Sequence, residues 1–177
     1  DVVELGFRTL NNKGFNGACA YSTDTYLKAF EIPEGLKVCV MINASEILQN
    51  GKYSESQLNK FFPNTSSSSS ITIVRIASHI HEFSEALKAS DILNKKGFKV
   101  GFNLMQVSEC TPQGLKLLAK EASKYSFEVL YFADSLGNMN EKKVLNVINQ
   151  LRLHWDGPIG IHAHDNMGLG LLNTLFA

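Results

Sequence analysis

The sequence predicts an α/β protein built on a parallel sheet, and two observations point to this class. Six short, almost wholly apolar runs alternate along the chain with longer segments whose apolar residues recur at helical spacing. Parallel strands covered by helices read as nearly continuous apolar runs rather than as an alternation of apolar and polar residues. Six successive strand-and-helix units therefore indicate a parallel α/β architecture.

The six apolar runs are the predicted strands. In chain order they cover residues 2–7, 36–42, 71–77, 98–105, 127–133 and 159–164. Six parallel strands fit an open doubly wound sheet or part of an eight-stranded barrel, and periodicity does not separate the two. No GxGxxG follows any of these runs and no GxxxxGK occurs, so the nucleotide-binding version of the doubly wound sheet lacks its usual signature.

The helices between the strands have recognisable ends. Thr111 followed by Pro112 is typical of an N-cap and a first helical residue, and Asn140 precedes another helix in the same way. Gly97 is a typical C-terminal cap of an earlier helix. The residues expected to face the sheet are Phe83, Ala86, Leu87 and Leu93, then Leu115, Leu118, Ala119 and Ala122, then Val144, Ile148 and Leu151.

A run of hydroxyl side chains from Thr65 to Ser70 interrupts this pattern. Its composition cannot build a core, so we expect a mobile surface loop there.

Composition bounds the kind of protein. At 177 residues the chain fits one domain, and 17 basic residues balance 17 acidic ones, so charge gives no argument for a nucleic acid or an anionic membrane as partner. The three cysteines are scattered and favour a reducing compartment over a disulfide framework. No apolar run approaches the ~20 residues of a membrane span. We expect a cytoplasmic protein.

Two histidines end the last apolar run. His162 and His164 stand two residues apart, and side chains alternate along a strand, so both project from the same face. Paired imidazoles at a rigid strand end suit a divalent metal, bound at ~2.0–2.1 Å if the metal is zinc. An incidental pair of polar histidines is the alternative.

Four short sequence motifs occur in order along the chain, each at the end of a predicted strand. They are DVVELGF at 1–7, VRIA at 74–77, ADSLG at 133–137 and GIHAHDNMGL at 160–169. In these motifs the chain resembles the metal-dependent lyase and aldolase family that includes 3-hydroxy-3-methylglutaryl-CoA (HMG-CoA) lyase, 4-hydroxy-2-oxovalerate aldolase and the isopropylmalate synthases. The resemblance covers the whole chain, and the HAHDNxGL segment is its most specific part.

The resemblance implies a (β/α)₈ TIM barrel with its site at the carboxyl ends of the strands. Against that pattern the chain supplies strands two through seven, an incomplete barrel. The family's first strand carries an Asp that completes the metal site beside a catalytic Arg, and no such Arg-Asp pair occurs here. We expect a piece of a longer enzyme, the alternative being a truncated, inactive protein. The incomplete barrel has two open sheet edges that can pair with another chain, so we expect a homo-oligomer or another structural element that covers those edges.

The resemblance also assigns roles. His162 and His164 are implied as ligands of Mn²⁺, Mg²⁺ or Zn²⁺, and Glu4 as a catalytic carboxylate, with a structural salt bridge as its alternative. Ser135 matches a hydroxyl position that contacts the substrate in relatives. Asp134 and Asn103 are expected as substrate contacts from their place at strand ends alone, although Asp134 could equally cap a loop. Asp165 and Asn166 either cap the next helix or orient the ligand imidazoles. Arg75, inside an apolar strand, needs a carboxylate, and we expect Glu4 or Asp134 as its partner.

The implied activity is that of a divalent-metal-dependent carbon–carbon lyase or aldolase acting on a hydroxy-oxo acid through a metal-stabilised enolate. Among the members of this family, the motifs at 133–137 and 160–169 are most similar to those of the 4-hydroxy-2-oxovalerate aldolase type. A Claisen-type synthase joining an acyl-CoA to a 2-oxo acid is one alternative. A biotin-dependent carboxyltransferase is another, but it usually needs a lysine that residues 102–107 lack. A non-catalytic barrel fragment acting as a binding subunit is the third.

Overall fold

The computed structural model describes residues 1–11 and 14–177, and its centre is a sheet of six parallel strands. The strands are hydrogen-bonded in chain order, β1-β2-β5-β6-β7-β8, so β1 and β8 are the two edges. Their bounds are Val2–Phe7 (β1), Lys37–Asn43 (β2), Ile73–Ser78 (β5), Lys99–Leu104 (β6), Val129–Ala133 (β7) and Ile159–His162 (β8). All six predicted strands are confirmed, each end lying within two residues of its expected place.

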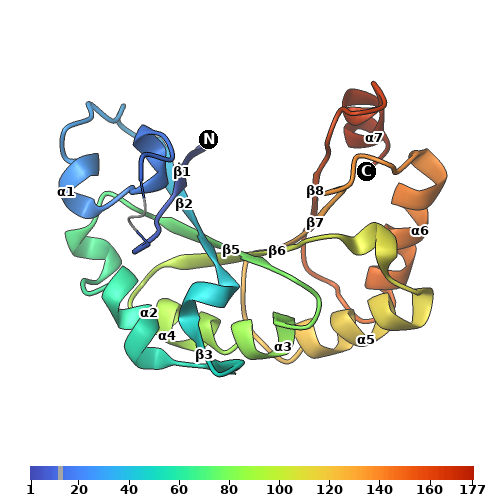
Figure 1. Ribbon diagram of the computed structural model, residues 1–177, viewed down its shortest axis with the longest axis horizontal. Helices are drawn as coiled ribbons and strands as arrows, with labels where there is room; N and C mark the ends of the chain where they lie inside the picture. The colour runs from blue at the N-terminus through green and yellow to red at the C-terminus, as the bar shows by residue number, and fades with distance from the viewer. Residues whose placement is uncertain (12–13) are drawn as a thin grey trace.

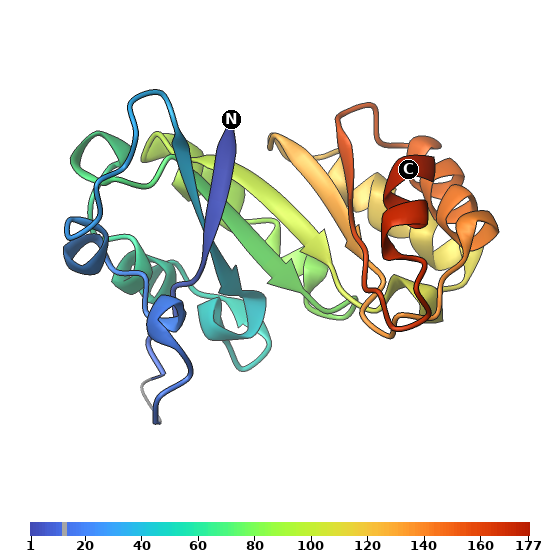
Figure 2. The same cartoon turned by 90° about the horizontal axis from the view of Figure 1, so that it is seen from above.

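The sheet bends into a trough, half of a barrel (Figure 1). Helices cover its convex side, and the two ends of the chain lie on opposite arms of the trough. Figure 2 looks into the concave side, where the strands run in one direction. A parallel strand needs a crossover before the next one begins, and right-handed crossovers place every helix on the same side of the curved sheet. The expected partial barrel is therefore confirmed.

Seven helices and four short 3₁₀ turns accompany the strands in the described part of the chain, and the last helix, α7, follows the last strand. The helices are α1 Asp24–Leu27, α2 Glu55–Phe61, α3 Phe83–Ala86, α4 Ala89–Lys95, α5 Pro112–Ala122, α6 Glu141–Arg152 and α7 Gly170–Phe176. The turns are η1 Ala18–Ala20, η2 Ala44–Ile47, η3 Ser66–Ser68 and η4 Val107–Glu109. A two-stranded hairpin, β3 Leu48–Gln49 and β4 Lys52–Tyr53, stands apart from the main sheet. None of the described helices is long and apolar enough to cross a membrane.

The predicted helix caps are present. The Thr111 side chain accepts the backbone N–H of Gly114 at 3.1 Å, and Asn140 accepts that of Lys143 at 3.1 Å. Gly97 ends α4 with φ 83°, the left-handed conformation that favours glycine.

The segment read as one helix before Gly97 is two helices, α3 and α4. The Ser90 hydroxyl donates to the Leu87 carbonyl at 2.7 Å, and the Ser90 backbone N–H bonds the same carbonyl. This three-residue bond replaces the regular α-helical one, and it divides the segment.

Alternate residues of each strand face the helices and make the core. Val74 and Ile76 on β5, Phe102 on β6 and Phe132 on β7 are fully buried there. Burial of one such side chain stabilises the fold by roughly 1.5–3 kcal/mol. The residues between them line the trough, and several of these are polar, so the concave side is where chemistry can occur.

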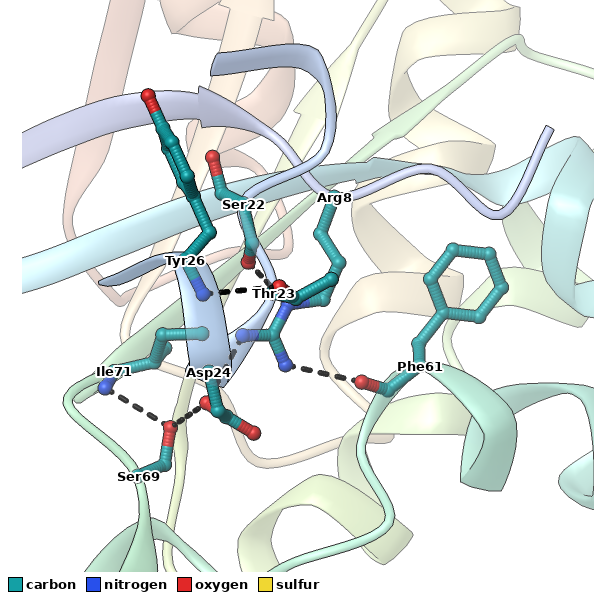
Figure 3. A network of polar contacts seen from close by, with 8 residues as sticks. All are labelled: Arg8, Ser22, Thr23, Asp24, Tyr26, Phe61, Ser69 and Ile71. Atoms are coloured by element: carbon teal, nitrogen blue, oxygen red, sulfur yellow. Dashed lines mark hydrogen bonds and ion pairs between the residues drawn. The ribbon is translucent and has the colours of Figure 1, made fainter. Parts of the chain in front are cut away.

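Arg8, directly after β1, is buried and binds three separate parts of the chain (Figure 3). Its Nε donates to the Ser22 carbonyl at 2.7 Å, its Nη1 to the Phe61 carbonyl at 3.0 Å and its Nη2 to Asp24 Oδ1 at 3.0 Å. The guanidinium also lies 5.1 Å from the centre of the Phe62 ring. The edge strand β1 is thereby fastened to α1 and to the end of α2.

The hydroxyl run lies at the surface, as predicted, but it is not a loose loop. Residues 66–68 form the turn η3, and the backbone N–H of Ser66 donates to the Lys96 carbonyl at 2.9 Å. The Ser69 hydroxyl donates to Asp24 Oδ1 at 2.5 Å. These bonds link the run to the network around Arg8, a use of serine that composition alone does not reveal.

Candidate metal and substrate site

His162 and His164 lie side by side at the carboxyl end of β8. Their ring centres are 5.2 Å apart and their planes are inclined by 61°. Both residues are half-buried. Burial, together with the nearby positive charge of Arg75, lowers the pKa of His162, against an opposing effect of Glu4. A lowered pKa favours neutral imidazole, the form that binds metals.

The paired imidazoles fit part of a divalent-metal site. Imidazole nitrogen suits Zn²⁺ and other transition metals, which take four or more ligands. Within residues 1–11 and 14–177, no group of three His, Cys, Asp or Glu side chains is arranged to hold a metal. The described residues therefore supply two candidate ligands, His162 and His164, and any further ligands of such a metal would have to come from elsewhere.

A charged pair occupies the middle of the trough. Arg75 Nη2 donates to Glu4 Oε1 at 2.7 Å, and the Cys39 thiol lies 3.5 Å from Glu4 Oε2. The predicted pairing of Arg75 with Glu4 is thus confirmed, and Glu4 lies on the inner face as expected. Both oxygens of Glu4 are engaged, Oε1 by Arg75 and Oε2 by the Cys39 thiol, and the catalytic role expected of Glu4 stays a prediction.

The ring of Tyr131 lies against the guanidinium group of Arg75. Arg75 lies 5.1 Å from the centre of the Tyr131 ring, a cation–π distance. The ring lies over Gly160 of β8, where a Cβ would collide with it, whereas a Cβ at Gly101 of β6 would meet the ring at an ordinary contact distance of 3.5 Å. The missing side chain of Gly160 thus makes room for the Tyr131 ring on the inner face. This arrangement was not predicted from the sequence, although Gly160 inside an apolar strand is a typical sign of close approach.

A hollow of about 370 Å³ opens beside this cluster. Its lining residues are Val2, Glu4, Lys37, Cys39, Ile73, Arg75, Lys99, Gly101, Glu128, Val129 and Tyr131. Most of them come from the amino halves of the strands, whereas the histidines stand at the carboxyl end. Arg75 and Tyr131 both line the hollow, and Tyr131 lies on β7, the strand next to β8, which carries His162.

The three predicted substrate contacts are in different situations. Asn103, on the inner face of β6, is only 4% exposed, and its side-chain oxygen has no hydrogen-bond partner among the described residues. The Ser135 hydroxyl accepts the backbone N–H of Gln106 at 3.0 Å, which ties together the loops after β6 and β7. Asp134 is 1% exposed and accepts the backbone N–H groups of Asn138 and Met139 at 3.0 and 3.1 Å. Asp134 therefore caps its loop, the alternative that the sequence left open.

Asp165 also caps. Its Oδ1 accepts the backbone N–H of Gly170, the first residue of α7, at 2.7 Å. The neighbouring Asn166 side chain packs against Gly137, whose φ of 60° and missing side chain permit the approach. The two residues fix the turn that follows the histidine pair, and through it the direction of His164.

Cys39 is the cysteine nearest to this site, and we expect it to resist alkylation. Burial, followed by the charge of Glu4, raises the pKa of Cys39 to about 12, and only the thiolate is a nucleophile. With iodoacetamide at pH 8, mass spectrometry should find Cys39 unlabelled in the folded protein while the half-buried Cys19 is labelled. Rapid labelling of Cys39 before unfolding would contradict its placement beside Glu4.

The fold and the site define a class: half of a parallel α/β barrel with paired histidines at the carboxyl end of its last strand. The HMGL-like family model matches residues 27–177, and the chain belongs to that family. The 4-hydroxy-2-oxovalerate aldolase of Geobacillus genomosp. 3 is 33% identical over 108 residues, which are 60% of this chain and 32% of that protein. The enzyme of the same name from Pelotomaculum thermopropionicum is 31% identical over 107 residues, 60% of this chain and 32% of that protein.

Two solved structures from this group of enzymes have a similar fold. The N-terminal domain of a predicted aldolase from Bacteroides vulgatus superposes with a TM-score of 0.84 at 27% identity, over 100% of this chain and 56% of that one. The HMG-CoA lyase of Bacillus subtilis superposes with a TM-score of 0.68 at 16% identity, over 89% of this chain and 55% of that one, a likeness of fold. The matched segment spans only about a third of the length of these curated relatives.

Proposed function

We propose that the protein containing this chain is a divalent-metal-dependent carbon–carbon lyase or aldolase acting on a hydroxy-oxo acid. The single observation that carries the proposal is the pair His162 and His164 on one face at the carboxyl end of a barrel strand. Sites in such barrels lie at that end. Membership of the HMGL-like family and the similarity to 4-hydroxy-2-oxovalerate aldolases support the same reading.

In this mechanism His162 and His164 would hold Mn²⁺, Mg²⁺ or Zn²⁺. The ion would supply the Lewis acid that polarises the oxo group and stabilises an enolate. The turn capped by Asp165 keeps His164 beside His162, and the lowered pKa of His162 keeps its ring available as a neutral ligand. Asn103 offers an unpaired amide oxygen that can accept a hydrogen bond from a substrate hydroxyl.

The test is an aldol-cleavage assay on the full-length protein with 4-hydroxy-2-oxovalerate, following the release of pyruvate. We expect cleavage with added Mn²⁺, its loss on treatment with a chelator and its recovery when the ion is restored. Cleavage that survives metal removal, or no cleavage with any of the three ions, would contradict the proposal. An acyl-CoA-dependent condensation in the same preparation would favour the Claisen-type synthase. Inactivity in both assays would favour a binding subunit.

A further inference from the structure

His162 and His164 are connected by a path of hydrogen bonds besides the backbone that joins them directly. The path leaves His162 at its carbonyl, which accepts the backbone N–H of Asp134 at 3.0 Å. The Asp134 carboxylate in turn accepts the backbone N–H of Met139 at 3.1 Å. The first half of the path therefore ties the end of β8 to the loop that follows β7.

Asn173 carries the path onward into α7. Its Nδ2 donates to the Met139 carbonyl at 2.9 Å. About one helical turn earlier, the backbone N–H of Gly170 donates to Asp165 Oδ1 at 2.7 Å. Asp165 directly follows His164 in the chain, so the path returns to the second histidine and closes a ring.

The part of this ring that lies farthest from the histidines is shielded from water. Asp134 and Met139 are each 1% exposed and Asn173 is 0% exposed, and α7 packs beside α6 (Figure 1). Hydrogen bonds in such an interior are stronger than bonds that water surrounds, and satisfied ones make the structure around them rigid. A displacement of α7 would therefore be passed to the turn that carries His164.

Asn173 is a poor choice for a residue that only fills space. Its Oδ1 is buried without a hydrogen-bond partner among the residues that the structure describes. A buried amide oxygen without a donor costs free energy, and an apolar side chain of similar volume would not incur that cost. What the amide adds is the bond to the Met139 carbonyl, which has a direction that an apolar contact lacks.

We propose that Asn173 is a positioning residue, which closes this ring and thereby holds the imidazole of His164 beside that of His162. This inference rests on the proposed metal site and adds to it a residue of α7. Two imidazole nitrogens that share one ion lie about 3–4 Å apart, since each bond measures ~2.0–2.1 Å for zinc. The ring centres are 5.2 Å apart, so a small shift of His164 would weaken joint binding.

The test uses the full-length protein and two measurements, the affinity for Mn²⁺ and the imidazole NMR resonances of the metal-free state. Asn173→Leu removes the donor at similar volume, and Asn173→Ala removes it without new bulk. We expect either variant to bind Mn²⁺ about 10–100-fold more weakly, the loss typical of residues that orient metal ligands. The Hε1 resonance of His164, assigned by its absence in His164→Ala, should move, while that of His154 stays in place.

Thr174→Val is the matched control on the same helix. It removes the hydrogen bond from Thr174 Oγ1 to the Gly170 carbonyl, 2.8 Å long, which does not belong to the ring. Val147→Ala, in the buried face of α6, controls for lost stability. Both controls should keep the wild-type Mn²⁺ affinity. Unchanged affinity or an unmoved His164 resonance in the Asn173 variants, or an equal loss of affinity in Val147→Ala, would overturn the inference.

The NMR measurement separates this inference from the proposed function. A protein that binds no metal, but whose His164 resonance moves in Asn173→Leu, would refute the metal site and keep Asn173 as the residue that positions His164. A protein that binds Mn²⁺ and cleaves its substrate equally well with and without Asn173, with the His164 resonance unmoved, would keep the metal enzyme and refute this inference.

Discussion

Replacing Arg8 by alanine is expected to lower the free energy of unfolding by about 3–5 kcal/mol, the cost of stranding a buried partner. Arg8 is 3% exposed, and its loss would leave Asp24 without its cation and the carbonyls of Ser22 and Phe61 without their donor. Domains of this size are stable by only about 5–15 kcal/mol. Urea unfolding followed by circular dichroism measures the change.

Lys99→Ala is the matched control for this prediction. Lys99 and Glu128 form an ion pair of the same 3.0 Å length as Arg8 and Asp24, but both side chains are about half exposed. An exposed pair contributes only about 0–1 kcal/mol. Equal losses of unfolding free energy in Arg8→Ala and Lys99→Ala would contradict the conclusion that burial makes the Arg8 contacts strongly stabilising.

The Arg8 effect should also depend on pH. Burial alone would raise the pKa of Asp24, but hydrogen bonds from Ser69 and Arg8, with the charge of Arg8, outweigh it and lower the pKa. A lowered pKa means that the ionised Asp24 stabilises the fold above its unfolded-state pKa of about 4. That contribution is lost as the pH falls through the lowered value, so the difference in unfolding free energy between wild type and Arg8→Ala should shrink in acid, while the part due to the Ser22 and Phe61 carbonyls remains.

The second large effect is expected at the histidine pair. In the full-length protein, His162→Ala or His164→Ala should reduce metal-dependent cleavage by at least about 100-fold, because even residues that only orient metal ligands typically cost 10–100-fold. The change should appear in kcat/KM, with the unfolding midpoint nearly unaltered, since both side chains are only half-buried.

His154→Ala is the control for the histidine variants. His154 follows α6 and stands before β8 begins, at the opposite end of the strand from His162. Full activity in His154→Ala beside loss in the other two would tie the effect to the pair. Equal activity in all three variants would remove the pair from the reaction.

The strands and the pair of histidines could be predicted because each rests on local pattern. Apolar runs buried against helices reveal strands, and the two-residue spacing of His162 and His164 places both rings on one face in any strand. The caps at Thr111 and Asn140 are local for the same reason. The pairing of Arg75 with Glu4 was foreseen as one of two choices, because a strand arginine needs a carboxylate.

Long-range contacts were not predictable in this way. The acceptors of Arg8 come from residues 14, 16 and 53 positions away, and nothing in the local sequence marks them. The position of the Tyr131 ring on β7 depends on Gly160, which lies on the neighbouring strand β8. The hydroxyl run looked like a loose loop because its anchors, Asp24 and Lys96, are distant in sequence. Self-association through the edges β1 and β8 stays a prediction.

The central claim is that the paired histidines are part of a metal centre, and elemental analysis of the purified full-length protein tests it most directly. The account predicts about one equivalent of Mn, Zn or Mg per chain, lost in His162→Ala while the variant stays folded by circular dichroism. A full-length protein that binds none of these ions, or a His162→Ala variant that keeps its full complement, would contradict it.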